Sequence, residues 1–210
     1  GFLHFLKNTH DGATFIAGIH PDSDKSGAAM RAAPIGIYAS INEVIEKSTM
    51  QAKLTHNTNE GINAAVAVSL MAHYFLYQVG PKAELPAFLA KHVPGQWAEP
   101  WMGEVGSKGY MSVRAALTSL LRNDSLSKLL KSCVAWTGDT DTVAAIALAV
   151  GSCSREMVKD IPEVLLNRLE DGHYGRGFLG ILDNSLMTVH AKQQCTRRRH
   201  PWWWCAGCFI

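Results

Sequence analysis

The sequence lacks several features that would assign it to common protein classes. It has no sustained alternation of apolar and polar residues, which is the pattern of a half-buried strand, so we expect no β-sheet domain. It also has little excess charge, because 20 lysines and arginines face 18 aspartates and glutamates, for a formal net charge of +2. A near-neutral chain offers no basic surface for long nucleic acids, and we expect no nucleic-acid partner.

The sequence also lacks the signals of export and of membrane insertion. Residues 1–7 contain no initiator methionine, no basic segment and no long apolar run, and the number of cysteines is odd, at five. We therefore expect reduced thiols in a cytoplasmic protein, and a chain that begins downstream of its natural start. Residues 61–80 carry no charge but include the polar Asn63 and His73. This favours a buried helix over a membrane span.

Helical periodicity is present over most of the chain. With 210 residues, of which 47% are hydrophobic, the chain can bury a sizeable core in one domain. Apolar spacing and capping residues predict helices over 41–54, from 58 or 59 towards 80, and over 81–90, 113–121, 126–133, 140–150, 162–169 and 178–189. The helix at 140–150 has no polar face beyond its first turn, so it should be central. The predicted class is all-α, as a compact helical domain over residues 1–190.

Local signals add detail to this prediction. Ser40 and Glu43 form a capping box in sequence, and Thr58 or Asn59 can cap the next helix. Residues 93–109 are rich in proline and glycine but contain two tryptophans, which predicts a structured loop with buried indoles.

The last twenty residues differ in character from the rest. Residues 191–210 are rich in arginine, tryptophan and cysteine, and we interpret them as a tail that is disordered or foreign. Four of them have the side chains of zinc ligands, Cys195, His200, Cys205 and Cys208. Their spacing is the reverse of a zinc knuckle, so an unstructured tail is the preferred interpretation.

The clearest candidate site is the segment at residues 137–142, directly before the predicted central helix. Asp139, Asp141 and Thr142 supply two carboxylates and a hydroxyl, an oxygen-only set that suits Mg²⁺, Ca²⁺ or Mn²⁺. The two carboxylates can converge only if Asp139 lies at the cap and Asp141 in the first turn, an entry that Gly138 permits. The alternative is ordinary helix capping by these residues.

Two further segments are candidates for ligand contact. Residues 26–36 combine small residues with Arg31, which predicts a loop whose amides approach a phosphate or a sugar. The alternative is a tight turn packed against a helix, in which Arg31 pairs structurally. His56 follows Thr55 between two predicted helices, where it is either a ligand contact or a residue that bonds to the loop.

Taken together and in this order, the three segments resemble the ADP-ribosylglycohydrolase family. Residues 26–36 are similar to its GAAMR-A-PIG segment, Thr55-His56 to its Thr-His element, and residues 138–142 to its GDxDT motif. Residues 109–116 and 169–177 are also similar in style. The resemblance implies an all-α fold with two Mg²⁺ or Mn²⁺ ions at the base of a cleft for ADP-ribose.

The resemblance also implies a set of site residues and an activity. The implied metal ligands are Asp139, Asp141 and Thr142, and the implied ligand-contacting residues are Ser26, Gly27, Ala28, Met30, Arg31 and His56. The implied reaction is hydrolysis of an N- or O-glycosidic ADP-ribosyl linkage, with an ADP-ribosylated protein or a small ADP-ribose compound as substrate.

The sequence departs from the family pattern in one respect. The family's early Thr-Asp-Asp motif and the acidic residue before it are absent, so the catalytic residue is unknown and we expect metal binding to be weak or absent. Asp22 and Asp24 are the only acids that stand near the missing position. The alternative function is a non-catalytic relative that binds ADP-ribose or is structural, like the crystallin-type members.

Overall fold

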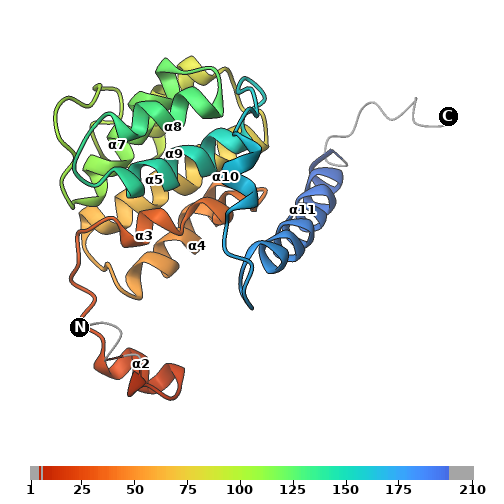
Figure 1. Cartoon of the computed structure of the whole chain (residues 1–210). Coiled ribbons are helices and arrows are strands. Elements are labelled where there is room, and N and C mark those ends of the chain that lie inside the picture. The colour runs from red at the N-terminus through yellow and green to blue at the C-terminus, as the bar shows by residue number, and fades with distance from the viewer. Residues whose placement is uncertain (1–4, 6, 199–210) are drawn as a thin grey trace.

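The computed structural model describes residue 5 and residues 7–198, and every regular element in this part of the chain is a helix (Figure 1). The elements are α2 (Gly12–Gly18), α3 (Gly27–Met30), η1 (Ala33–Ile37), α4 (Ile41–Lys53), α5 (Asn59–Leu76), η2 (Lys82–Glu84), α6 (Leu85–His92), α7 (Gly109–Arg122), α8 (Leu126–Val134), α9 (Thr140–Cys153), α10 (Glu163–Asn167) and α11 (Arg176–Arg198). The predicted all-α class is confirmed.

Helix α5 is the centre of the core. It packs against α4, η1, α3, α7 and α9, and the side chains of Leu70, Met71 and Tyr74 are almost completely buried. This is the uncharged stretch that the sequence assigned to a buried helix. Among the described residues, no helix is long and apolar enough to cross a membrane.

Helix α9 is the second central element, as predicted. It packs against α5, α7 and α8, and Val143, Ile146 and Val150 are fully buried. The loop at 93–108 closes one side of this core. Its two indoles, Trp97 and Trp101, are 3% and 9% exposed, so the prediction of a structured loop is confirmed.

The starts of α4 and α5 lie where the sequence predicted them, but only one of the two predicted side-chain caps is formed. Thr58 caps α5 with its side chain, which accepts a hydrogen bond of 3.1 Å from the amide of Gly61. Ser40 is the N-cap of α4, but its side chain makes no capping hydrogen bond, so the predicted capping box is not formed. Ser40 still marks the start of α4, because its backbone is extended, with φ −100° and ψ 133°.

The loop predicted at residues 26–36 is wrong. The segment forms the short helix α3 and the 3₁₀ helix η1, because its small residues let it lie close against α5. Gly36 shows how close this approach is. A Cβ atom at Gly36 would lie 2.6 Å from the backbone nitrogen of His73.

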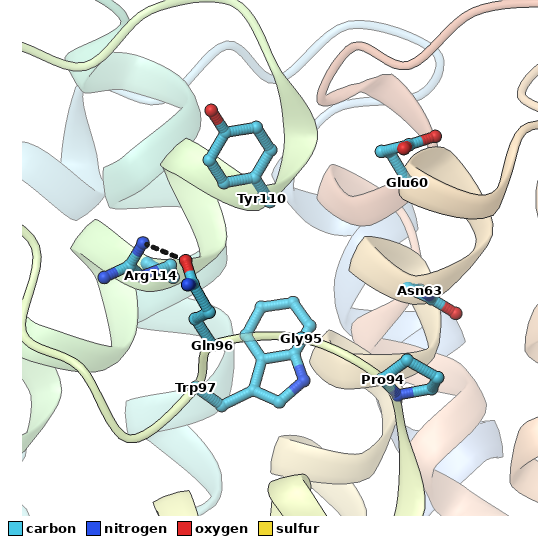
Figure 2. Close-up of a pocket in the computed structure, with 8 residues that line it drawn as sticks. All are labelled: Glu60, Asn63, Pro94, Gly95, Gln96, Trp97, Tyr110 and Arg114. Carbon is cyan, nitrogen blue, oxygen red and sulfur yellow. Dashed lines mark hydrogen bonds between the residues drawn. The ribbon is translucent and has the colours of Figure 1, made fainter.

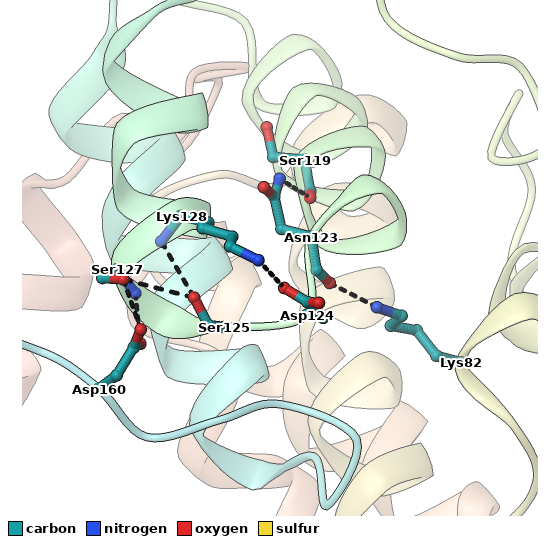
Figure 3. A network of polar contacts seen from close by, with 8 residues as sticks. All are labelled: Lys82, Ser119, Asn123, Asp124, Ser125, Ser127, Lys128 and Asp160. Carbon is teal, nitrogen blue, oxygen red and sulfur yellow. Dashed lines mark hydrogen bonds and ion pairs between the residues drawn. The ribbon is translucent and has the colours of Figure 1, made fainter.

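A polar network joins the start of α8 to the chain that follows α9 (Figure 3). The Asp160 carboxylate accepts hydrogen bonds from the Ser127 amide at 2.9 Å and the Ser127 hydroxyl at 2.6 Å. These bonds lower the pKa of Asp160 to about 2. Nearby, the backbone of Val158 pairs with Asp124 and Leu126. These bonds therefore hold the start of α8 against the segment that follows α9.

The C-terminal helices differ from the prediction in their lengths. Helix α10 ends at Asn167, whereas α11 begins at Arg176 and runs to Arg198, past the predicted domain boundary at residue 190. Figure 1 shows α11 to one side of the other helices. The ring centroids of Tyr77 and His190 lie 5.0 Å apart, so this helix contacts the domain through His190. Residues 191–198 are thus helical. The predicted zinc-type residues His200, Cys205 and Cys208 lie outside the described residues.

Candidate functional site

The entry to α9 is built on two successive residues with left-handed backbone. Thr137 has φ 62° and Gly138 has φ 76°. A Cβ atom at Gly138 would lie 2.1 Å from the carbonyl oxygen of Val105, so only glycine fits there. That same carbonyl accepts the amide of Asp139 at 2.9 Å, and the Val105 amide donates to the Thr137 carbonyl at 3.2 Å. The loop at 93–108 therefore fixes the backbone that carries Asp139.

The Asp139 carboxylate does not cap the helix that it begins. It is the N-cap residue of α9, as predicted, but it makes no side-chain bond to a helix amide. Its two oxygens instead accept the hydroxyl of Thr142 at 2.8 Å and the hydroxyl of Ser26 at 3.4 Å. Asp141 lies in the first turn and is exposed. Ordinary capping therefore does not account for this acidic pair.

The donors at this position are all hard oxygens, which matches Mg²⁺ or Mn²⁺ in chemistry. Within the described residues, however, no group of three or more His, Cys, Asp or Glu side chains is placed to hold a metal ion. Two carboxylates and one hydroxyl are also fewer than the six oxygens of an octahedral Mg²⁺ site. The residues present fit part of a metal site.

The predicted ligand-contacting residues converge only in part. Ser26 contacts Asp139, and the Met30 sulfur lies 3.5 Å from the Thr142 hydroxyl. Gly27 adjoins the His56 ring, since a Cβ atom at Gly27 would lie 3.3 Å from His56 Nε2. These residues, although far apart in sequence, surround one region. Ala28 does not, because it is fully buried and has no surface to offer to a ligand.

Arg31 pairs within the protein, as the alternative interpretation proposed. Its guanidinium donates to the side-chain oxygen of Gln51, to the Gly27 carbonyl at 3.3 Å and to the Thr55 hydroxyl at 2.6 Å. Partial burial lowers the pKa of Arg31, which still leaves it charged at neutral pH.

His56 is buried, with 8% of its surface exposed, and Thr55 Oγ1 lies 2.7 Å from its Nδ1 atom. Burial, and to a lesser degree the charge of Arg31, lowers the pKa of His56, while Asp24 opposes the shift. The lowered pKa favours the neutral form of the His56 imidazole.

The two acids considered as substitutes for the missing family motif have other roles. Asp24 pairs with Lys108, and that hydrogen bond lowers the pKa of Asp24. Asp22 forms an isolated backbone bridge with His56 and its residue is exposed. The side-chain hydrogen bonds of Asp139 among the described residues go to Ser26 and Thr142 instead.

The structure also holds a pocket of about 310 Å³ (Figure 2). It is lined from α5, from the loop at 93–108 and from α7, by Glu60, Asn63, Pro94, Gly95, Gln96, Trp97, Tyr110 and Arg114. Arg114 is held by Gln96 and by Glu99, and its guanidinium lies 5.5 Å from the ring centre of Trp101. The pocket thus combines aromatic rings with fixed polar groups.

The sequence analysis did not identify this pocket. The only available signal was the family-like stretch at residues 109–116, which contains Tyr110 and Arg114. Nothing in the sequence indicated that Glu60 and Asn63 face them, because that contact depends on how α5 and α7 pack.

Comparison with known proteins agrees with the sequence motifs. The family model described as ADP-ribosylglycohydrolase matches residues 2–195, which is most of the chain. No match to the chain was found among curated proteins.

Proposed function

Because the chain belongs to the ADP-ribosylglycohydrolase family, we propose that the region around Asp139, Ser26, Gly27 and His56 binds the ADP-ribosyl group of a substrate and contributes to hydrolysis of its glycosidic bond. The observation that carries the proposal is the convergence of three motifs on one region. Ser26 lies against Asp139 although the two residues are 113 positions apart in the chain. Packing of the core alone does not require this hydroxyl–carboxylate contact.

The residues offer complementary chemistry for such a ligand. Asp139, Asp141 and Thr142 would hold a Mg²⁺ or Mn²⁺ ion, which when bound supplies an anchor for ribose hydroxyls and for the attacking water. Gly27 lies directly against the His56 ring, since a Cβ atom at Gly27 would be only 3.3 Å from His56 Nε2. Ser26 positions the Asp139 carboxylate through its hydroxyl.

The neighbouring pocket is suited to the other end of the ligand. An adenine ring can stack on an exposed aromatic face and bond to amide groups at its edge. Tyr110 is 37% exposed, and Asn63 and Gln96 line the same pocket. Backbone pairing of Lys25 with Lys108 links the segment before Ser26 to the start of α7, which carries Tyr110.

The second candidate is a protein that binds ADP-ribose without turnover. It is supported by the small number of metal-binding groups around Asp139 within the described residues. The two candidates share a ligand and differ in the chemical step, so one set of experiments separates them.

Isothermal titration of the full chain with ADP-ribose, with and without Mn²⁺, tests the proposal. We expect ADP-ribose to bind, Mn²⁺ alone to bind weakly, and Asp141→Ala to remove any effect of Mn²⁺. Tyr110→Ala should weaken ADP-ribose binding, while the matched variant Tyr110→Phe keeps the ring and binds as the unmodified chain does.

Release of ADP-ribose from ADP-ribosylated arginine and serine peptides then separates the two candidates. Turnover that depends on Mn²⁺ and is lost in Asp141→Ala supports the hydrolase, and binding without turnover supports the second candidate. Absence of ADP-ribose binding to a folded chain would refute both.

A further inference from the structure

The side chains of Arg31, Thr55 and His56 form a chain of hydrogen bonds that ends at the candidate site. Arg31 Nη2 lies 2.6 Å from Thr55 Oγ1, and Thr55 Oγ1 lies 2.7 Å from His56 Nδ1. The three residues come from two segments of the chain, since Arg31 follows α3 and the other two follow α4. We call these three side chains the Arg–Thr–His relay.

The direction of the first bond is fixed by chemistry. A guanidinium carries only donors, so Arg31 donates and Thr55 Oγ1 accepts. The hydroxyl then has one hydrogen left to donate, and His56 Nδ1 is its only other partner among the described residues. If Nδ1 carried a hydrogen, the hydroxyl would accept two bonds and its own hydrogen would have no acceptor.

We propose that the Arg–Thr–His relay holds His56 in the neutral form with its hydrogen on Nε2, so that this nitrogen is a fixed donor at the edge of the ring opposite the relay. The surroundings of His56 Nε2 agree with a hydrogen on that nitrogen. His56 Nε2 has no hydrogen-bond partner among the described residues, and this edge of the ring lies against Gly27, next to Ser26 of the candidate site. Arg31 and Thr55 are thus positioning residues, which act through the imidazole.

The role of that donor rests on the proposed function. A neutral imidazole N–H binds an oxygen acceptor, such as a phosphate or ribose oxygen of the ADP-ribosyl group. In this form His56 cannot accept a proton at Nε2, so the relay assigns it to ligand binding and not to proton abstraction. Burial lowers the pKa of His56, which agrees with a ring held in its neutral form.

The tautomer can be measured without a ligand. In the ligand-free full chain, long-range ¹H–¹⁵N NMR spectra of His56 should show hydrogen on Nε2 and a hydrogen-bonded, unprotonated Nδ1. Thr55→Val removes the hydroxyl at nearly constant shape, and the Nδ1 resonance should move to that of a nitrogen without a donor. Thr55→Ser restores the hydroxyl and should restore the resonance.

Binding of ADP-ribose gives the second measurement. Thr55→Val should lower the affinity by about two- to tenfold, the range that one net hydrogen bond provides, and Thr55→Ser should bind as the unmodified chain does. His56→Gln, which places an amide N–H near the same position, should retain more affinity than His56→Ala.

The outcomes distinguish the relay from the proposed function. A hydrogen on Nδ1 in the unmodified chain, or identical Nδ1 resonances in Thr55→Val and Thr55→Ser, would overturn the relay. If Thr55→Val unfolds, Arg31→Lys is the replacement, because lysine keeps the charge but does not form the three bonds of the guanidinium. An Nε2–H tautomer in a chain that fails to bind ADP-ribose would leave the relay standing and overturn the proposed function.

Discussion

Adding a single methyl group at Gly138 tests whether the loop at 93–108 positions Asp139. Gly138 has φ 76°, and a new Cβ atom would lie 2.1 Å from the Val105 carbonyl oxygen. Alanine in this left-handed conformation costs about 1–2 kcal/mol. Moving the Val105 carbonyl away also breaks its bond to the Asp139 amide, which costs about 1 kcal/mol. Gly138→Ala should therefore lower the free energy of unfolding by about 2–3 kcal/mol.

Gly103, in the supporting loop at 93–108, is a matched control for Gly138. It has φ 88°, but a Cβ atom there meets nothing within 4 Å. Gly103→Ala thus carries the backbone strain without the steric contact, and part of that strain is offset by the lower entropy of the unfolded chain.

Urea unfolding of both variants gives the comparison, and ADP-ribose titration adds a functional measurement. We expect Gly138→Ala to be less stable than Gly103→Ala by at least about 1 kcal/mol and to lose ligand affinity, while Gly103→Ala keeps it. Equal losses of stability in the two variants, with affinity unchanged in both, would refute the assignment of Val105 as the support of Asp139.

Three further predictions concern the core, the α8 network and His56. Leu129 is fully buried whereas Val134 on the same helix is 58% exposed, so in urea unfolding Leu129→Ala should cost about 2–5 kcal/mol and Val134→Ala less than about 0.5 kcal/mol. The pKa of Asp160 is lowered from 3.8 to about 2, so its contribution to stability is present above pH 3.8 and is lost as the pH falls towards 2. Melting temperatures across this range should fall less steeply for Asp160→Asn than for the unmodified chain. The pKa of His56 is lowered from 6.5 by burial, so an NMR titration should give a midpoint below 6.5. The stability that the neutral His56 contributes should be present above pH 6.5 and lost as the pH falls below it. A midpoint above 6.5 would contradict the burial of the ring.

The buried helices could be predicted from the sequence, because their apolar residues lie on all sides of the helix and require burial. Helix α9 has no polar face beyond its first turn, and its position in the core follows from that composition. Capping by Thr58 was predictable for a similar reason, since the bond to Gly61 is local. Ser40 shows the limit, because the sequence gives the boundary and not the rotamer of the side chain.

Only the parts of the candidate site that belong to sequence motifs could be predicted. Asp139 as the N-cap of α9 followed from Gly138 and from the spacing of the two carboxylates. The helical form of residues 26–36 was missed, because the close packing of α3 and η1 on α5 outweighs the local preference of small residues for a loop. The pocket beside Tyr110 was missed because Glu60 reaches it only through the packing of α5 on α7.

The contact between Ser26 and Asp139 has a consequence for the order in which the chain folds. The bonds between Ser127 and Asp160 join residues 33 positions apart, whereas Ser26 and Asp139 are separated by 113 positions. Closing a longer loop costs more chain entropy, so the α8–α9 unit can form early while the candidate site forms only after both halves of the chain have docked. A ligand that bridges the two segments therefore binds only to the fully folded chain. At a concentration 100 times its dissociation constant, it would add about 2.7 kcal/mol to the stability of the whole domain.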